Sequence, residues 1–122
     1  MITMTDIHKE LYDVSRDGDH TRVRELLAAG ANPNKYKKDL GYTALHLAAW
    51  MGHNQIVTLL IHHPLSDVNV SDKYGGTALY YAARSGYRDV VINLMDAGAD
   101  PHIRYNHGKT PLEVAKNDDI AR

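Results

Sequence analysis

The segment Gly-Tyr-Thr-Ala-Leu-His-Leu-Ala-Ala at residues 41–49 returns at residues 75–83 as Gly-Gly-Thr-Ala-Leu-Tyr-Tyr-Ala-Ala. A shorter form, Gly-Lys-Thr-Pro-Leu-Glu-Val-Ala, occupies residues 108–115. The glycines that open the copies are 34 and 33 residues apart, a period too long for a coiled-coil heptad and typical of a stacked repeat protein. Each unit of such a protein buries its apolar face against its neighbours, so this repeat constrains the fold more than any other feature.

A second series of glycines indicates a divergent copy near the N-terminus. Gly18, Gly52 and Gly86 are each 34 residues apart, and Leu11 occupies the position of Leu45 in the next copy. At 122 residues the chain fits one domain. We therefore expect a single domain over residues 1–122 with repeats at about 7–36, 37–71, 72–104 and 105–122, the last incomplete.

The spacing of apolar residues within one copy predicts two antiparallel helices. In the second copy, Leu45, Ala48 and Ala49 form a stripe at helical spacing that ends at Gly52. A second amphipathic segment covers residues 56–61 and has counterparts in the first and third copies. Each repeat is therefore predicted to be a helix-turn-helix unit.

Helix caps can be predicted from the same motif. Thr110 to Glu113 has the pattern of a complete capping box with Pro at the first helical position. Thr43 with His46 predicts a looser version of that box. Tyr80 replaces this histidine in the third copy, so part of the capping is expected to be lost there.

The segments between the helix pairs predict extended loops with a tight turn. Residues 34–41, 69–75 and 102–108 carry turn residues and glycine without helical periodicity. Pro64 stands where Gly30 ends the outer helix of the first copy, and because proline lacks the N–H of a glycine cap, we expect that helix to end differently.

Together these residues resemble the ankyrin repeat family. The resemblance rests on Thr-Ala-Leu-His-Leu-Ala-Ala followed by Gly-His, on Leu-Leu-Ala-Ala-Gly-Ala-Asn-Pro-Asn and on Leu-Met-Asp-Ala-Gly-Ala-Asp-Pro, and it covers about residues 7–122. It implies an all-α repeat solenoid of stacked helix-turn-helix units with projecting β-hairpin loops. It also implies that the concave surface, made of the hairpins and inner helices, binds another protein.

Two arguments select the residues expected to contact a partner. Trp50 and Met51 occupy positions that hold Arg84 and Ser85 in the third copy, and such variation within one chain fits solvent exposure. The ankyrin resemblance adds the hairpin tips, where an insertion before Gly41 leaves two registers open. The predicted partner-binding residues are Tyr36, Leu40, Tyr42, Trp50, Met51, Lys73, Tyr74, Arg84, Arg104 and His107.

Alternatives remain open for the aromatic residues. Trp50 could instead fold over the neighbouring repeat, and Tyr80 and Tyr81 are expected to be packing residues. A second possibility for function is recognition of a nucleotide or short oligonucleotide, by stacking on Trp50 or Tyr74 beside Lys73, Arg84 and Arg104.

The sequence offers no catalytic motif. Gly108-Lys109-Thr110 resembles the end of a phosphate-binding loop, but Ile103 occupies the position of the required glycine. No nucleophile can be matched to a base, and there is no Cys. Eight His lack the spacing of a metal site, and His46 and His53 are expected to be structural. We therefore predict no enzymatic activity, no cofactor and no metal.

Composition limits the classes of partner. Fourteen Lys and Arg against 15 Asp and Glu give a net charge of −1, which disfavours nucleic acid and anionic membranes. No segment is apolar enough for a signal peptide or a membrane span. The sequence thus predicts a monomeric intracellular protein, most simply a cytoplasmic one.

The main functional prediction is a non-catalytic scaffold that binds a protein or peptide partner. A structural spacer or a test sequence without a specific ligand is the third alternative, after nucleotide recognition. Asp119 replaces the glycine expected after the inner helix of the fourth copy, and the sequence ends at Arg122, where an outer helix is expected to begin. This pattern favours a segment of a longer polypeptide.

Overall fold

The computed structural model describes residues 4–37 and 39–115, with side chains from residue 7 onward. Their helices come in pairs joined by short turns, as the two hydrophobic segments of each copy predicted. The elements are α1 (Met4–Asp17), α2 (His20–Ala28), α3 (Ala44–Trp50), α4 (Asn54–Ile61), α5 (Ala78–Ser85), α6 (Arg88–Asp96), the 3-10 helix η1 (Tyr105–His107) and α7 (Pro111–Val114).

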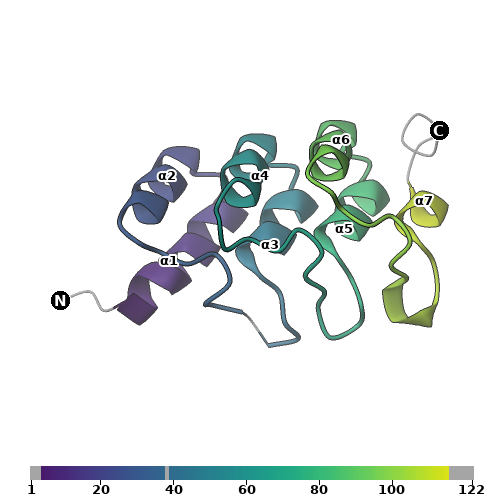
Figure 1. The fold of residues 1–122 in the computed structure, drawn as a ribbon, viewed down its shortest axis with the longest axis horizontal. Helices are drawn as coiled ribbons and strands as arrows, with labels where there is room; N and C mark the ends of the chain where they lie inside the picture. Colours follow the sequence, from purple (N-terminus) through teal and green to yellow (C-terminus); the bar gives the residue numbers. More distant parts are fainter. Residues whose placement is uncertain (1–3, 38, 116–122) are drawn as a thin grey trace.

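The helices form two parallel rows (Figure 1). The inner row contains α1, α3, α5 and α7, each packed on the next, and the outer row contains α2, α4 and α6. Three long loops project from the inner row, and their tips lie side by side below the helices in this view. We call them the first, second and third loops; they precede α3, α5 and α7. This arrangement confirms the predicted all-α solenoid.

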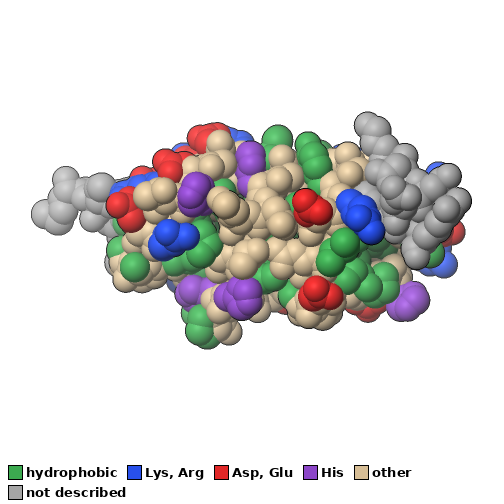
Figure 2. All heavy atoms as spheres, turned by 90° about the horizontal axis from the view of Figure 1, so that it is seen from above, with side chains coloured by type: hydrophobic (Ala, Val, Ile, Leu, Met, Phe, Trp, Pro, Cys, Tyr) green, Lys and Arg blue, Asp and Glu red, His purple; other side chains and the backbone are tan. Residues whose placement is uncertain are grey.

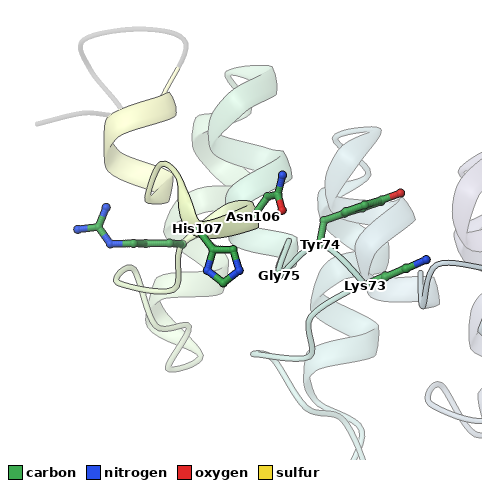
Figure 3. Close-up of a pocket in the computed structure, with 6 residues that line it drawn as sticks. Lys73, Tyr74, Gly75, Asn106 and His107 are labelled. Carbon is green, nitrogen blue, oxygen red and sulfur yellow. The ribbon is translucent and has the colours of Figure 1, made fainter.

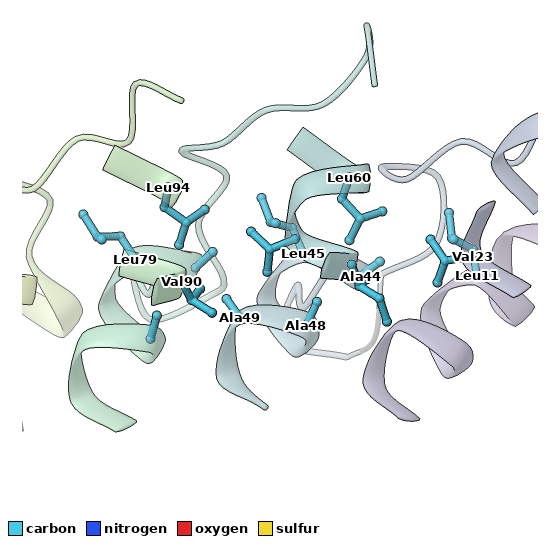
Figure 4. Close-up of a cluster of buried hydrophobic side chains, with 14 of the residues drawn as sticks. Leu11, Val23, Ala44, Leu45, Ala48, Ala49, Leu60, Leu79, Val90 and Leu94 are labelled. Atoms are coloured by element: carbon cyan, nitrogen blue, oxygen red, sulfur yellow. The ribbon is translucent and has the colours of Figure 1, made fainter. Parts of the chain in front are cut away.

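The core runs between the two rows (Figure 4). Leu45, Leu60 and Leu79 are at most 4% exposed, and similar side chains repeat along the stack. Ala48 and Ala49 have no exposed surface, so α3 can approach both neighbouring inner helices closely. Burial of each leucine stabilises the stack by about 2 kcal/mol before the entropy of ordering is counted. The regular positions of the motif therefore account for the stack.

Capping bonds fix where the inner helices begin. Thr43 accepts a bond from the His46 amide while the Nδ1 atom of His46 accepts one from the Thr43 amide. The predicted box between Thr43 and His46 is therefore present, and both of its bonds form, since the imidazole nitrogen acts as the carboxylate usually does. The box formed by Thr110 and Glu113 is complete, as predicted. Thr77 has only the bond that its side chain accepts from the Tyr80 amide, without the returning bond of a capping box. This confirms the expected loss of part of the capping there.

Pro64 changes the end of the second outer helix, as expected. Gly30 and Gly98 follow α2 and α6 in a left-handed conformation, with φ of 98° and 94°. After α4 there is no such glycine; His62 caps the helix in a right-handed conformation. The Ser66 amide then bonds to the His63 carbonyl in a turn. The outer helix therefore ends without the left-handed cap used elsewhere.

The loops differ from the sequence prediction in one respect. Within residues 4–37 and 39–115, no β-strand forms. The second loop closes through a bond from the Asp72 amide to the Gly76 carbonyl, and the third through one from the Tyr105 amide to the Lys109 carbonyl. One such bond makes a turn, whereas a strand ladder requires several. The loops are thus hairpin-shaped without paired strands.

Charged groups of both signs lie over the outer helices α2 and α6, whereas α4 has none (Figure 2). No helix in the described part of the chain is long and apolar enough to cross a membrane. The predictions made from Asp119 and from the end at Arg122 lie outside the described residues.

Candidate functional site

The loop tips are joined to one another by backbone hydrogen bonds. The Lys73 amide donates to the Leu40 carbonyl at 2.6 Å, and the Asn106 amide donates to the Tyr74 carbonyl at 2.5 Å. Gly75 permits this approach: its φ is 85°, and a Cβ atom there would lie 2.9 Å from the Arg104 carbonyl oxygen. The three tips therefore form one connected edge that holds their side chains in a fixed order.

A buried carboxylate organises the second loop. Asp72 is 6% exposed, and its Oδ1 atom accepts hydrogen bonds from the amides of Tyr74 at 2.7 Å and Gly76 at 3.0 Å. Its Oδ2 atom accepts a bond from the Tyr81 hydroxyl on α5. Burial, and then this bond to Asp72, raise the pKa of Tyr81 well above its usual range. The phenol therefore stays a neutral donor and ties the loop to the helix.

The Tyr81 side chain also explains why the second loop has a glycine at position 76. A Cβ atom at Gly76 would lie 2.6 Å from the Tyr81 hydroxyl oxygen and 2.7 Å from Asp72 Oδ2. In the second copy the corresponding residues are Tyr42 on the loop and Leu47 on the helix. The large side chain thus comes from the loop in one repeat and from the helix in the next.

These differences between the second and third copies produce a continuous line of aromatic rings. Trp50 stacks on Tyr81 with ring centroids 4.2 Å apart and the planes 8° apart, and Tyr42 meets Trp50 edge-on at 5.7 Å. Tyr80 stacks on Tyr105 of the third loop at 4.5 Å. We call the whole set the aromatic strip; it contains Tyr42, Trp50, Tyr81, Tyr80, Tyr105 and Tyr74.

Arg84 lies on the aromatic strip. Its guanidinium carbon is 5.1 Å from the ring centroid of Trp50, 5.2 Å from that of Tyr81 and 5.7 Å from that of Tyr80. These distances allow cation–π attraction to the rings. Among the described residues, no carboxylate forms an ion pair with Arg84. The strip therefore carries a positioned cation whose N–H groups can meet an acceptor from outside.

The structure places the predicted contact residues in two groups. Leu40, Met51 and Tyr74 are exposed, at 40%, 45% and 38%. The charged tip residues Lys73, Arg104 and His107 are exposed as well, whereas Tyr36, Tyr42, Trp50 and Arg84 are half-buried.

The Trp50 ring folds over the neighbouring repeat and stacks on Tyr81, which is the alternative that the sequence left open. Tyr80 and Tyr81 are buried, which confirms that both are packing residues. Tyr36 packs edge-on against Tyr12 of α1 at 5.2 Å, so the structure does not bring it into the strip.

Sequence reasoning missed Tyr105. Its signal was an aromatic residue in a turn segment, three positions before Gly108. Because the corresponding residue of the previous loop is Asp72, comparison of the copies gave no reason to expect a ring there. Only the packing shows that Tyr105 extends the strip to the loop tips.

The histidines that the motif contains are structural, as predicted. His46 has no exposed surface; its Nε2 atom lies 2.9 Å from the Gly76 carbonyl oxygen and its Nδ1 atom accepts from Thr43. Burial lowers the pKa of His46, since the charged ring would lose hydration and its Nδ1 proton would face the Thr43 amide. His53 reaches the Arg16 carbonyl. In the described residues no three His, Asp or Glu side chains gather as metal ligands.

Comparison with known proteins agrees with this geometry. A family model described as ankyrin repeats matches residues 11–105 in three copies. The chain belongs to the ankyrin repeat family. Ankyrin repeats are themselves non-catalytic and typically form a protein-interaction module.

The ankyrin repeats also match segments of larger proteins. A probable E3 ubiquitin-protein ligase of Oryza sativa subsp. japonica is 36% identical over 93% of this chain and 22% of its own length. A transient receptor potential cation channel homologue of Caenorhabditis elegans is 32% identical over 94% of the chain and 10% of its own length. The human photoreceptor ankyrin repeat protein is 35% identical over 70% of the chain. The chain spans less than a quarter of the length of each of these relatives.

Proposed function

We propose that this ankyrin domain binds a protein or peptide partner on the surface formed by the loop tips and the inner helices, which we call the inner face. The observation that carries the proposal is the aromatic strip, which ends in the exposed ring of Tyr74 and bears Arg84 along its length. Tyr, Trp and Arg are the residues most enriched at the energetic centres of protein interfaces.

Rigidity supports the same proposal. The tips are joined by backbone bonds, and Asp72 fixes the second loop from within. A surface that is already ordered loses less side-chain and loop entropy when a partner binds. The exposed side chains of Leu40, Met51 and Tyr74 add apolar area beside the ordered rings.

Nucleotide recognition receives less support. One face of the Trp50 ring is covered by Tyr81, and Arg84 already lies against both rings. A base would therefore have to displace existing packing to stack there between two rings. In the larger polypeptide that the relatives suggest, we infer that these repeats act as the recognition module for another protein.

The test compares two double variants in capture experiments with immobilised domain. Tyr74→Ala with Arg84→Gln alters the inner face, and Ile92→Ala with Arg88→Gln makes matched changes on exposed α6. A specific partner should be retained by the wild type and by the α6 variant. Loss of about 2 kcal/mol or more in affinity is expected for the inner-face variant.

Circular dichroism must show that both variants keep their helices. Equal retention of the partner by the wild-type domain and the inner-face variant would contradict the proposal, and so would loss of the partner only in the α6 variant.

A further inference from the structure

A cavity of about 280 Å³ lies between the tips of the second and third loops. Lys73, Tyr74 and Gly75 line one side, and Arg104, Asn106 and His107 line the other. Figure 3 shows the His107 ring beside the Gly75 turn, and the side chains of Tyr74 and Lys73 extending from that turn away from the third loop. The cavity exists because the bond from the Asn106 amide to the Tyr74 carbonyl holds the tips of the two loops together.

The lining of this cavity is cationic although the whole chain has a net charge of −1. Lys73 and Arg104 line it from opposite loops, and the Arg104 guanidinium also donates to the Gly108 carbonyl and pairs with Glu113. On the inner-face elements of residues 72–115, the cations are Lys73, Arg84, Arg104 and Lys109, and the carboxylates are Asp72 and Glu113. The acidic residues Asp89 and Asp96 of the same repeat lie on outer helix α6. This part of the inner face is therefore more positive than the chain as a whole.

Both inner-face carboxylates are already engaged within the domain. Asp72 is buried under bonds from Tyr74, Gly76 and Tyr81. Glu113 accepts from the Thr110 amide at 2.9 Å, and its Oε1 atom lies 3.4 Å from a guanidinium nitrogen of Arg104. Bonds from Thr110 lower the pKa of Glu113. Lys73 forms no ion pair with any described residue, so an external anion would meet a cation without a partner.

We propose that the cavity receives an Asp or Glu side chain of an acidic partner segment bound along the inner face. This inference rests on the proposed function and names the chemistry of the partner. Lys73, which has no ion-pair partner among the described residues, supplies the charge that attracts the carboxylate. Arg104 adds to it from beside Glu113, and Asn106 and His107 add polar groups at the edge of the cavity. The ring of Tyr74 covers the aliphatic part of the entering side chain, and the next acidic residues lie near Arg84.

The packing of the inner face favours a side chain over a nucleotide. A base that stacked on Trp50 would have to displace the rings and the guanidinium already packed there. An extended polypeptide can instead place one side chain in the cavity and pass along the neighbouring strip. The occupant is therefore an acidic polypeptide rather than a free nucleotide.

The experiment measures fluorescence anisotropy of three peptides that carry a neutral fluorophore. Each has roughly ten residues, about 33 Å when extended, and alternates Leu with Glu, Gln or Lys. We expect the Glu peptide to bind the wild-type domain about tenfold more tightly than the Gln peptide and the Lys peptide to bind least. The affinity for the Glu peptide should fall as salt is raised from about 50 to about 300 mM, because exposed charges are screened.

Two charge-reversal variants provide the matched comparison. Lys73→Glu changes the cavity, and Lys35→Glu makes the same change in net charge on an exposed residue outside it. Lys73→Glu should weaken the Glu peptide by about tenfold or more, and Lys35→Glu by less than about twofold. Equal loss in both variants would overturn the inference, as would equal binding of the Glu and Gln peptides.

The two proposals can fail separately. If the Glu and Gln peptides bind equally and both are lost in Tyr74→Ala, the inner face binds polypeptide but has no acidic preference. If none of the peptides binds, the acidic segment is overturned while the capture experiment still tests the inner face. A single-stranded oligothymidine of similar length that binds through Lys73 more tightly than the Glu peptide would also overturn the assignment.

Discussion

The pairing of Gly76 with Tyr81 gives the sharpest test of how this repeat is built. Gly76→Ala adds one methyl group 2.6 Å from the Tyr81 hydroxyl oxygen and 2.7 Å from Asp72 Oδ2. The ring cannot retreat freely, because Tyr81 is 1% exposed and stacks on Trp50. Overpacking of this kind costs about 1–3 kcal/mol.

The net effect is smaller than this steric cost. Replacing glycine by alanine also restricts the unfolded chain, which stabilises the folded state by about 0.4–1 kcal/mol when the conformation is allowed. Gly76 is not among the glycines with positive φ, so that gain applies. We expect Gly76→Ala to lower the free energy of unfolding by about 1–2 kcal/mol, measured by urea denaturation followed by circular dichroism.

The double variant isolates the contact. Tyr81→Leu introduces the residue that the second repeat has at Leu47 and removes the two Tyr81 atoms that the new methyl group would meet. It also removes the bond that holds Asp72 Oδ2, the third atom in contact, in its place. In that background Gly76→Ala should cost less than about 0.5 kcal/mol, which gives a coupling energy of about 1 kcal/mol or more. If Gly76→Ala costs the same in both backgrounds, the steric reasoning is refuted.

Three further predictions concern stability. Burial lowers the pKa of His46 in the folded protein. As the pH falls below about 6.5, this histidine is therefore protonated first in the unfolded chain, and the free energy of unfolding decreases. His46→Gln should flatten this pH dependence in urea titrations between about pH 7.5 and about pH 5.5. Thr43→Ala removes one side of a complete capping box and should cost about 1–2 kcal/mol in the same assay, more than Thr77→Ala at the incomplete one, and equal losses would contradict the roles given to the caps. Leu60→Ala opens a cavity at a fully buried site and should lower the unfolding free energy by about 2–5 kcal/mol, whereas Ile92→Ala on the exposed face should change it by less than about 0.5 kcal/mol.

The fold could be predicted from sequence because its determinants are local and repeated. Leu45, Ala48 and Ala49 have helical spacing, and the same residues recur one period later. Capping was predictable for the same reason, apart from the completeness of the box at Thr43. A histidine is not the usual partner in that box, and only its buried position shows that Nδ1 accepts the bond.

The candidate site could be predicted only in part. The exposed tips followed from the family pattern, and Leu40 and Tyr74 are indeed exposed. Met51, which was selected because its position varies between copies, is exposed as well. The contacts between repeats could not be predicted from the family pattern. They depend on how side chains at different positions of the motif pack against one another in the space between two repeats. Trp50 and Tyr81 occupy different positions in the motif, yet their rings stack.

The β-hairpins expected in the loops came from the family resemblance, whereas the turn residues predicted only extended segments with a tight turn. The structure shows that the later two loops are held by a few turn bonds and by the bonds between neighbouring tips, not by a strand ladder. The positions of Lys73 and Arg104 around one cavity depend on that joining of the tips. The net charge of the sequence could not reveal this cationic cavity, because the acidic residues that bring the net charge to −1 lie on other parts of the chain.

Site-specific photo-crosslinking tests the central claim, that the inner face is the binding surface. A benzophenone amino acid is placed at Tyr74 on the inner face or at Ile92 on α6, both exposed, and irradiated in a lysate. We predict a discrete crosslinked partner from position 74 that disappears when Arg84→Gln is added, with no equivalent product from position 92. The same product from both positions, or a product from position 92 alone, would contradict the account.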